Sequence, residues 1–128
     1  GEFRYPAAIA VGPGGQLFVS DQLNFRVQVF GPDGAFVREI GGLGDQPGSF
    51  TRPKGVAVDS RGHLYVVDAA FSNVQVFDPT GRPCGVLPKV KGDQPLTTCV
   101  LGGPDHSVLY IAHGTAIYSR KLTVLKPK

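Results

Sequence analysis

The sequence is poor in the residues that metal and disulfide centres need. It contains no Met and no Trp, and only two Cys and three His among 128 residues. Cys84 and Cys99 are too few for a disulfide scaffold and have no Cys or His neighbour at zinc spacing. His63, His106 and His113 are scattered, with no pair at zinc spacing on one element. We therefore expect two free thiols, histidines in surface or packing positions, and no metal site.

The common signatures of covalent catalysis and of nucleotide binding are also missing. No Ser-His-Asp or Cys-His set follows from spacing, and the sequence has no nucleophile elbow. The glycines of residues 41–44 lack the fingerprint spacing and the following Lys of phosphate loops, so they predict a flexible turn. We expect no cofactor and no catalytic residue, which makes an enzyme the less favoured class.

Long apolar runs are absent as well. No run approaches the roughly 20 residues that span a bilayer, so membrane insertion is not expected. No segment has the length and the 3.6-residue period of an amphipathic helix. The chain begins at Gly1 with no initiating Met and no visible signal peptide, which suggests a processed or excised piece of a longer chain. The compartment is therefore not readable from a targeting segment.

What the sequence does contain is regular punctuation by Gly and Pro. The 18 Gly and 11 Pro fall between apolar runs, as in a chain of short strands and tight turns. The net charge of +3 divides into −2 over residues 1–81 and +5 over residues 82–128. A basic end can attract anions, but a solvated, lysine-rich sheet edge is the favoured interpretation.

An internal repeat is the strongest feature. Residues 1–34 align with residues 48–81 at a constant offset of 47, without gaps and with 15 identities. Chance would give roughly two or three identities at ordinary residue frequencies. A third, looser unit follows, so the chain is interpreted as one domain of three repeats, at about 1–47, 48–92 and 93–128.

Each repeat holds three short apolar runs and a weaker fourth. The runs cover residues 9–11, 17–19, 27–30 and 36–40, then 56–58, 64–67, 74–77 and 86–90, then 97–101, 109–112, 116–119 and 122–125. Runs that are apolar on both faces are typical of sheets packed face to face. Four strands in each period of roughly 40–50 residues predict an all-β propeller with about three four-stranded blades.

The repeated motifs resemble a known family. Gly-x-Phe-x-x-Pro-x-x-(Ile/Val)-Ala-Val, Gly-x-Leu-(Phe/Tyr)-Val-x-Asp and Val-Gln-Val-Phe-x-Pro-x-Gly, within residues 1–90, resemble the NHL repeat. Residues 52–59 and 65–71 look most like bacterial NHL-repeat proteins, which implies a secreted or periplasmic location. The resemblance implies a ring of usually six four-stranded blades.

The third repeat is similar to a second family. Residues 97–105 and 109–111 look like a late blade of the gluconolactonase/senescence-marker family, six-bladed lactonases with a divalent cation in the channel. That family has metal-binding Asn and Asp residues just after the Pro that opens an inner strand. The matching positions here are Ala7, which has no donor atom, and Lys54, which is itself a cation. The resemblance therefore transfers the fold and not the metal chemistry.

Three blades do not close a propeller ring, which normally has four to eight. An isolated half-ring would expose two apolar blade faces, which soluble proteins rarely leave bare. We expect either a homodimer that completes six blades or a fragment of a larger propeller, and we favour the homodimer. The architecture also separates the thiols, with Cys84 on an outer strand and Cys99 on an inner one, so no disulfide is expected.

Candidate site residues cluster in the loops. Asp21 and Asp68 end the second strand of their repeats, and recurrence favours turn caps over ligands or bases. Asn24 and Arg26 complete a turn that resembles the family's Asp-x-x-Asn-x-Arg, in which Arg26 is expected to span blades and bond carbonyls or carboxylates. Phe71, at a loop tip, either marks a contact surface or folds back on the next blade.

Arg52 and Lys54 are expected at the channel mouth, where they would bind an anion or form a solvated rim pair. The sequence thus predicts a non-catalytic binding module for a protein, a peptide or a small anionic ligand, through Arg52, Lys54, Phe71, Asn24 and Arg26. The alternatives are a metal-dependent lactonase-like hydrolase, an RNA-binding NHL domain, and a fragment kept only for its fold. Nucleic acid is not an expected partner, because a basic stripe with interleaved aromatics is lacking.

Overall fold

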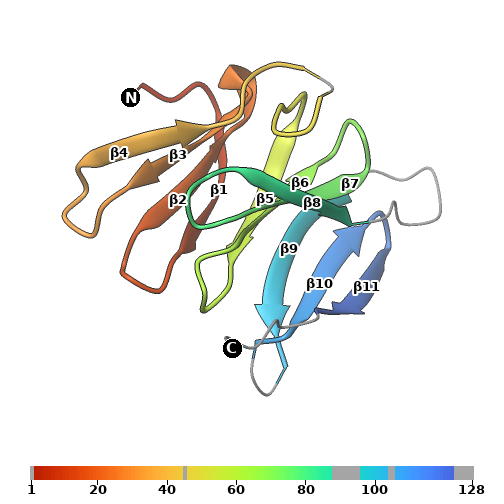
Figure 1. Ribbon diagram of the computed structural model, residues 1–128. Coiled ribbons are helices and arrows are strands. Elements are labelled where there is room, and N and C mark those ends of the chain that lie inside the picture. The colour runs from red at the N-terminus through yellow and green to blue at the C-terminus, as the bar shows by residue number, and fades with distance from the viewer. Residues whose placement is uncertain (1, 45, 88–95, 104–105, 123–128) are drawn as a thin grey trace.

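The chain folds into three antiparallel β-sheets that follow one another in a row (Figure 1). The computed structural model describes residues 2–44, 46–87, 96–103 and 106–122. The first sheet consists of β1 (Pro6–Val11), β2 (Leu17–Asp21), β3 (Arg26–Phe30) and β4 (Phe36–Ile40). The second consists of β5 (Pro53–Val58), β6 (Leu64–Asp68), β7 (Asn73–Phe77) and β8 (Pro83–Leu87). The third consists of β9 (Leu96–Gly102), β10 (Val108–His113) and β11 (Ala116–Lys121).

Each sheet is a meander in which sequential strands are neighbours, as in a propeller blade. The only helix among the described residues is the 3-10 turn η1 (Gln22–Asn24), and no described helix could traverse a bilayer. The all-β class and the blade architecture predicted from the repeat are confirmed. We refer to the three sheets as the first, second and third blade.

Three strands begin three residues before their apolar runs, and the other described limits differ by no more than two residues. β1 and β5 begin three residues earlier than expected, because Pro6 pairs with Asp21 and Pro53 with Asp68 across a β-bulge. β8 starts at Pro83 instead of residue 86. The apolar run did not reveal this start, because the first part of the strand carries few apolar side chains. The rest of the expected run at 86–90, and most of the expected strand at 122–125, lie outside the described residues.

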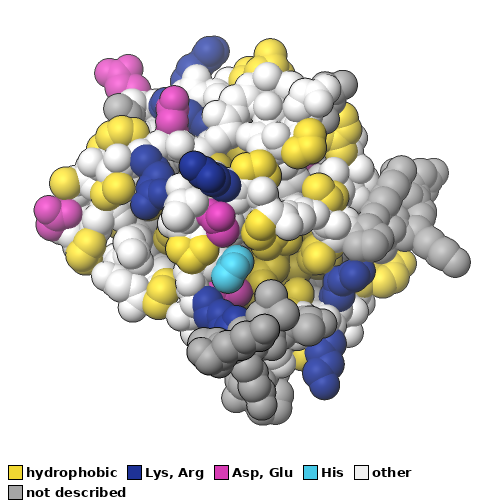
Figure 2. Space-filling view, in the orientation of Figure 1, with side chains coloured by type: hydrophobic (Ala, Val, Ile, Leu, Met, Phe, Trp, Pro, Cys, Tyr) yellow, Lys and Arg dark blue, Asp and Glu magenta, His cyan; other side chains and the backbone are white. Residues whose placement is uncertain are grey.

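Many large apolar side chains reach the surface, where they are interspersed with charged ones (Figure 2). On the first and third blades they include Ile9, Val11, Val37, Val100 and Ile117. Scattered exposed apolar residues are normal in soluble proteins, but this does not explain why the exposed apolar side chains concentrate on the first and third blades.

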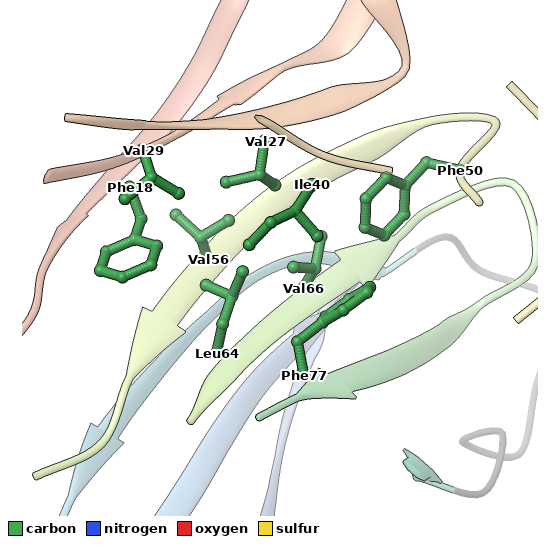
Figure 3. Close-up of a cluster of buried hydrophobic side chains, with 9 residues drawn as sticks. All are labelled: Phe18, Val27, Val29, Ile40, Phe50, Val56, Leu64, Val66 and Phe77. Atoms are coloured by element: carbon green, nitrogen blue, oxygen red, sulfur yellow. The ribbon is translucent and has the colours of Figure 1, made fainter. Parts of the chain in front are cut away.

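The first core fills the space between the first and second blades (Figure 3). The first blade contributes Phe18, Val27, Val29 and Ile40, and the second blade with its preceding segment contributes Phe50, Val56, Leu64, Val66 and Phe77. Burial of each large apolar side chain stabilises the fold by about 1.5–3 kcal/mol. The rings of Phe50 and Phe77 lie 5.6 Å apart, within the range of favourable aromatic pairs.

A second core joins the second and third blades. It contains Ala57, Tyr65, Val67 and Val74 from the second blade, and Leu96, Cys99, Leu109 and Ile111 from the third. Alternate residues of β6 therefore face opposite blades, with Leu64 and Val66 on one side and Tyr65 and Val67 on the other. This two-sided burial explains why β6 is a continuous apolar run instead of an alternating pattern.

The innermost strands β1, β5 and β9 pack against one another in sequence. Gly55 on β5 lies so close to β9 that a Cβ atom would be 2.5 Å from the Cα of Thr98. A residue without a side chain is therefore required at position 55.

Hydrogen bonds also join the first and second blades. The Ser20 hydroxyl donates to the Lys54 carbonyl, and the Arg38 guanidinium donates to the Thr80 carbonyl at 2.8 Å.

Substitution Gly55→Ala should destabilise the chain by about 1–3 kcal/mol, because the added Cβ must push β9 away from β5. Gly42→Ala is the matched control, since a Cβ there meets nothing within 4 Å and should change stability by less than about 1 kcal/mol. Urea unfolding followed by circular dichroism measures both. Equal effects of the two substitutions would contradict the close approach of β5 and β9.

The two cysteines occupy the strands that the sequence predicted. Cys84 is exposed on the outer strand β8, Cys99 is buried on the inner strand β9, and both are free thiols. Burial raises the pKa of the Cys99 thiol to about 12. The pKa of Cys84 is also raised, first by partial burial and then by the charges of Asp78 and Asp59. Only Cys84 is thus accessible to a reagent, and the expectation that no disulfide forms is confirmed.

We predict that a thiol reagent such as a maleimide modifies one cysteine per folded chain and two in denaturant, because the thiolate is the reactive form and requires access. Cys84→Ser should abolish labelling of the folded chain, whereas Cys99→Ser should leave it intact. Mass spectrometry of the labelled chain identifies the site. Rapid labelling of Cys99 without denaturant would show that the contact between the second and third blades opens readily.

Candidate ligand-binding site

The predicted ligand-binding residues all lie along one edge of the blade row, at the end of each sheet where its inner strand begins. The inner strands begin there, next to the loops that leave β2 and β6, at the upper edge of Figure 1. We call this end the loop rim and define it as residues 2–5, 22–25, 49–54 and 69–72. The five predicted ligand-binding residues lie in or directly beside it, on the first two blades.

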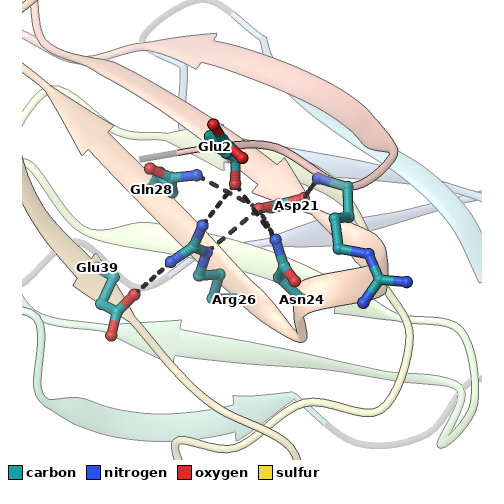
Figure 4. A network of polar contacts seen from close by, with 7 residues as sticks. Glu2, Asp21, Asn24, Arg26, Gln28 and Glu39 are labelled. Atoms are coloured by element: carbon teal, nitrogen blue, oxygen red, sulfur yellow. Dashed lines mark hydrogen bonds and ion pairs between the residues drawn. The ribbon is translucent and has the colours of Figure 1, made fainter.

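A buried carboxylate organises the rim of the first blade (Figure 4). Asp21 Oδ1 accepts the backbone N–H of Arg4 at 2.7 Å. Its Oδ2 accepts the side chains of Asn24, Arg26 and Gln28 at 2.8, 3.2 and 3.3 Å. One carboxylate thereby connects the segment before β1, the turn after β2 and the strand β3.

Asn24 and Arg26 are fully engaged within the first repeat. Arg26 forms an ion pair of 2.7 Å with Glu39 and donates to the Glu2 carbonyl at 2.8 Å. Asn24 also donates to the Glu2 carbonyl, at 3.3 Å. Arg26 thus bonds a carbonyl and carboxylates as expected, but these partners belong to its own blade and do not span two blades. The geometry gives both residues a structural role, and ligand binding by them stays a prediction.

The pKa of Asp21 lies below its ordinary value of 3.8. Burial of the carboxyl group acts to raise the pKa, but the hydrogen bonds from Asn24, the Arg4 backbone, Arg26 and Gln28 together outweigh burial. The charged form is therefore the one that the folded chain holds.

The second blade closes the same turn with backbone groups alone. Asp68 accepts the N–H groups of Thr51, Arg52 and Ala70, at 2.9, 3.1 and 3.1 Å. The contact with Ala70, two residues on, is an Asx-type turn. The prediction of an Asx-type turn cap is confirmed for Asp68. Asp21 differs, because its backbone donor is Arg4, before β1, and it contacts the following turn through the side chain of Asn24 instead of a backbone N–H.

Because Asp68 needs no side-chain donor, the second blade is free to vary its loop. Phe71 stands at the position of Asn24, with 39% of its surface exposed, so it neither folds back fully nor projects freely. Arg52 is exposed at the start of β5, where its carbonyl accepts the N–H of Ala69 at 3.0 Å. Lys54 is half-buried on β5. Within the described residues, neither cation takes part in a salt bridge.

The rim has three exposed apolar residues that sequence reasoning did not select, which are Phe3, Tyr5 and Leu23. Tyr5 occupies the position of Arg52 and has a φ of 73°, which is uncommon for a residue other than Gly. Leu23 lies on η1 and is also exposed. The repeat alignment is the signal that could have found Tyr5, because it places this residue opposite a predicted ligand-binding position.

In the third blade a histidine takes the place of the capping Asp. His113 pairs with Leu96 in the register in which Asp21 pairs with Pro6 and Asp68 with Pro53. It is buried, its ring lies 5.4 Å from that of Tyr118, and its Nε2 has no hydrogen-bond partner among the described residues. The expectation of a packing histidine is confirmed for this residue.

The described residues contain no group of three or more His, Cys, Asp or Glu side chains that could hold a metal ion. Beside the rim, Asp21 and Asp68 accept hydrogen bonds, and Glu39 is paired with Arg26. What the rim does provide is cationic and aromatic groups on a backbone that Asp68 holds in place.

Comparison with solved structures places the chain among propellers. Hydrazine synthase of Kuenenia stuttgartiensis is 25% identical, with a TM-score of 0.73 over 91% of this chain and 32% of that one. The gluconolactonase XC5397 of Xanthomonas campestris is 23% identical, with a TM-score of 0.74 over 96% and 39%. Regucalcin of Agrobacterium tumefaciens is 20% identical, with a TM-score of 0.67 over 85% and 38%. The chain thus spans less than half of each of these proteins, and the likeness concerns the fold.

At the level of sequence, a family model described as DUF5128, 6-bladed beta-propeller, matches residues 4–86, which is more than half of the chain. No curated protein matches. The matched segment covers the first two blades up to residue 86 and the loop rim from residue 4 onward, and it ends before the third blade.

Substitution Asp21→Asn should lower stability by about 1–3 kcal/mol at neutral pH, because it removes the charge that four donors share. The folded pKa of Asp21 is depressed, so its contribution is present above the unfolded value of 3.8 and disappears as the pH falls through the folded pKa. The stability gap between native chain and variant should therefore close on acidification.

Chemical unfolding at a series of pH values from about 7 to 2 measures this gap. Asp33→Asn serves as the control, since Asp33 caps an exposed turn through the N–H of Ala35, and should change stability by less than about 0.5 kcal/mol. A gap for Asp21→Asn that stays constant with pH would contradict the linkage.

Proposed function

Since the chain belongs to the DUF5128 family of six-bladed β-propellers, we propose that it is a non-catalytic binding module whose loop rim holds an anionic ligand. The ligand group is a carboxylate or a phosphate, carried by a peptide, a protein or a small molecule. The observation that carries this proposal is the pair Arg52 and Lys54, two cations at the start of an inner strand without an acidic partner among the described residues.

The two repeats differ in how they use their cations, and this difference supports the proposal. In the first, Arg26 is bound by Asp21 and Glu39 and holds the turn together. In the second, Asp68 secures the turn and the segment before β5 through backbone N–H groups, and the guanidinium of Arg52 has no acidic partner in the part of the chain that the structure describes. A cation that the fold does not use is available to a ligand, and Arg presents a planar fork suited to two anionic oxygens.

Preorganisation of the backbone supports the same site. The N–H of Arg52 donates to Asp68, and its carbonyl accepts from Ala69, so the residue is anchored on both sides. Anchoring lowers the entropy cost that binding imposes on a loop. Phe71 lies in the loop that Asp68 caps and adds an exposed ring, a residue type enriched at binding sites.

The motifs of the first two blades support kinship with NHL-type propellers, and a binding site in the loops of such a propeller is consistent with this proposal. A lactonase-like activity is the second candidate, because gluconolactonase and regucalcin share the fold. It has weaker support here, since Lys54 places a cation where that family has a metal ligand. Titration with calcium distinguishes the two candidates, and tight calcium binding would favour the lactonase.

We predict that calorimetry at low salt detects binding of at least one of three anionic probes, which are inorganic phosphate, citrate and a short poly-glutamate peptide. Arg52→Gln and Lys54→Gln should each weaken this binding about tenfold, or about 1.4 kcal/mol, because each removes one charge-assisted contact. The control is Arg61→Gln, in the β5–β6 turn at the opposite end of the blade.

Two results would overturn the proposal. One is the absence of binding by all three anions at low salt, where surface electrostatics are strongest. The other is equal weakening by Arg61→Gln, which would mean that net charge alone attracts the anions and that the rim has no special role.

A further inference from the structure

The two internal blade contacts are copies of each other. Each joins a trailing face, turned toward the next blade, to a leading face, turned toward the previous one. The leading face of the second blade is formed by Val56, Leu64, Val66 and Phe77, and its trailing face by Ala57, Tyr65, Val67 and Val74. The offset of 47 residues and the strand register locate the same faces on the end blades.

The first blade carries a bare copy of the leading face. Ile9 is paired with Val19 as Val56 is paired with Val66, so the two residues are equivalent. Ile9 is 61% exposed, whereas Val56, packed against the first blade, is 6% exposed. Val11, next on the same face, is exposed too. This face has the composition of a blade contact, but none of the blades that the structure describes packs against it.

The third blade carries a bare copy of the trailing face. Ile117 is paired with Ala112 as Val74 is paired with Val67, and it is 75% exposed where Val74 is 1% exposed. Val100 corresponds to Ala57 by its pairing with Tyr110 and is also exposed. The two bare faces lie at opposite ends of the blade row (Figure 1), and they correspond to the two kinds of face that meet in each internal contact.

The charges of the end repeats are opposite. Residues 1–47 carry three Lys or Arg against five Asp or Glu, which gives −2, and residues 93–128 carry four against two, which gives +2. A contact between the first blade of one chain and the third blade of another would thus unite opposite net charges, which favours encounter. Contacts of like blades would unite equal charges.

We propose that the occupant of both bare faces is a second copy of this chain, bound head to tail. The third blade of each copy then packs on the first blade of the other, so that two identical contacts form and no apolar face remains. Two copies of three blades make six, the number that the family description specifies. Each new contact continues the geometry that the chain already uses twice internally.

The experiment is the mass of the 128-residue chain in solution, by light scattering or sedimentation over a range of concentrations. A closed pair has twice the mass of 13.5 kDa, or 27 kDa. Two charged variants test the faces, Ile9→Lys on the leading face and Ile117→Glu on the trailing face. Each alone should give a 13.5 kDa monomer, because in a pair of identical variants both contacts contain a buried charge.

Mixing the two variants should restore the 27 kDa species. In the mixed pair one contact is unmodified, and the other places the introduced Lys opposite the introduced Glu. Restoration also shows that both variants fold, which circular dichroism checks independently. Val86→Lys, at an exposed apolar residue on the outer strand of the second blade, is the matched control and should leave the pair intact.

Three outcomes would overturn the inference. A native chain that stays monomeric at high micromolar concentration would mean that another polypeptide, or a continuation of this one, covers the faces. Pairs that survive both charged variants would indicate a different interface. Variants that are monomeric and folded but do not restore the pair on mixing would exclude the head-to-tail arrangement.

Discussion

The burial of apolar side chains on both faces of a sheet is the interaction on which the rest of this structure depends. An antiparallel sheet with one apolar face needs one packing partner, but the second blade has two apolar faces and therefore needs two packing partners. Its strand β6 illustrates the constraint, since Leu64 and Val66 pack on the first blade while Tyr65 and Val67 pack on the third. Sheets of this kind stack in rows, and the close approach at Gly55 sets how near successive inner strands must come.

The same constraint separates the parts of each repeat that are fixed from those that vary. The faces must match the neighbouring blade, so Val27, Val29 and Phe30 recur as Val74, Val76 and Phe77. The segment before the inner strand needs a carboxylate to accept its N–H groups, so Asp21 recurs as Asp68. Once that cap is in place, the tip of the turn bears no packing requirement. Asn24 can then be replaced by Phe71, and Tyr5 by Arg52, without cost to the stack.

The features that recur between repeats could be predicted from the sequence, whereas those that depend on contacts particular to one repeat could not. The repeat, the blade architecture, the cap at Asp68 and the separation of Cys84 from Cys99 were predictable, because each depends on local pattern and on one periodicity. The early start of β5 was not, since Pro53 and Lys54 carry no apolar signal and join the strand through a bulge. The partners of Arg26 were predicted by type but not by blade, because a sequence does not show which of several carboxylates a long side chain reaches.

The position of the variable residues connects the proposed binding site with the proposed pairing. Head-to-tail contacts repeat the internal geometry, in which the inner strands of successive blades all begin at the edge of the row that carries the loop rim. A closed ring would therefore present both copies of Arg52 and Lys54 on a single face, around one opening. Cations that converge on one opening raise the local potential more than the same cations dispersed over two faces. An anion that binds weakly to one half-ring would then bind more strongly to the ring, so closure would act on affinity without any residue changing its contacts.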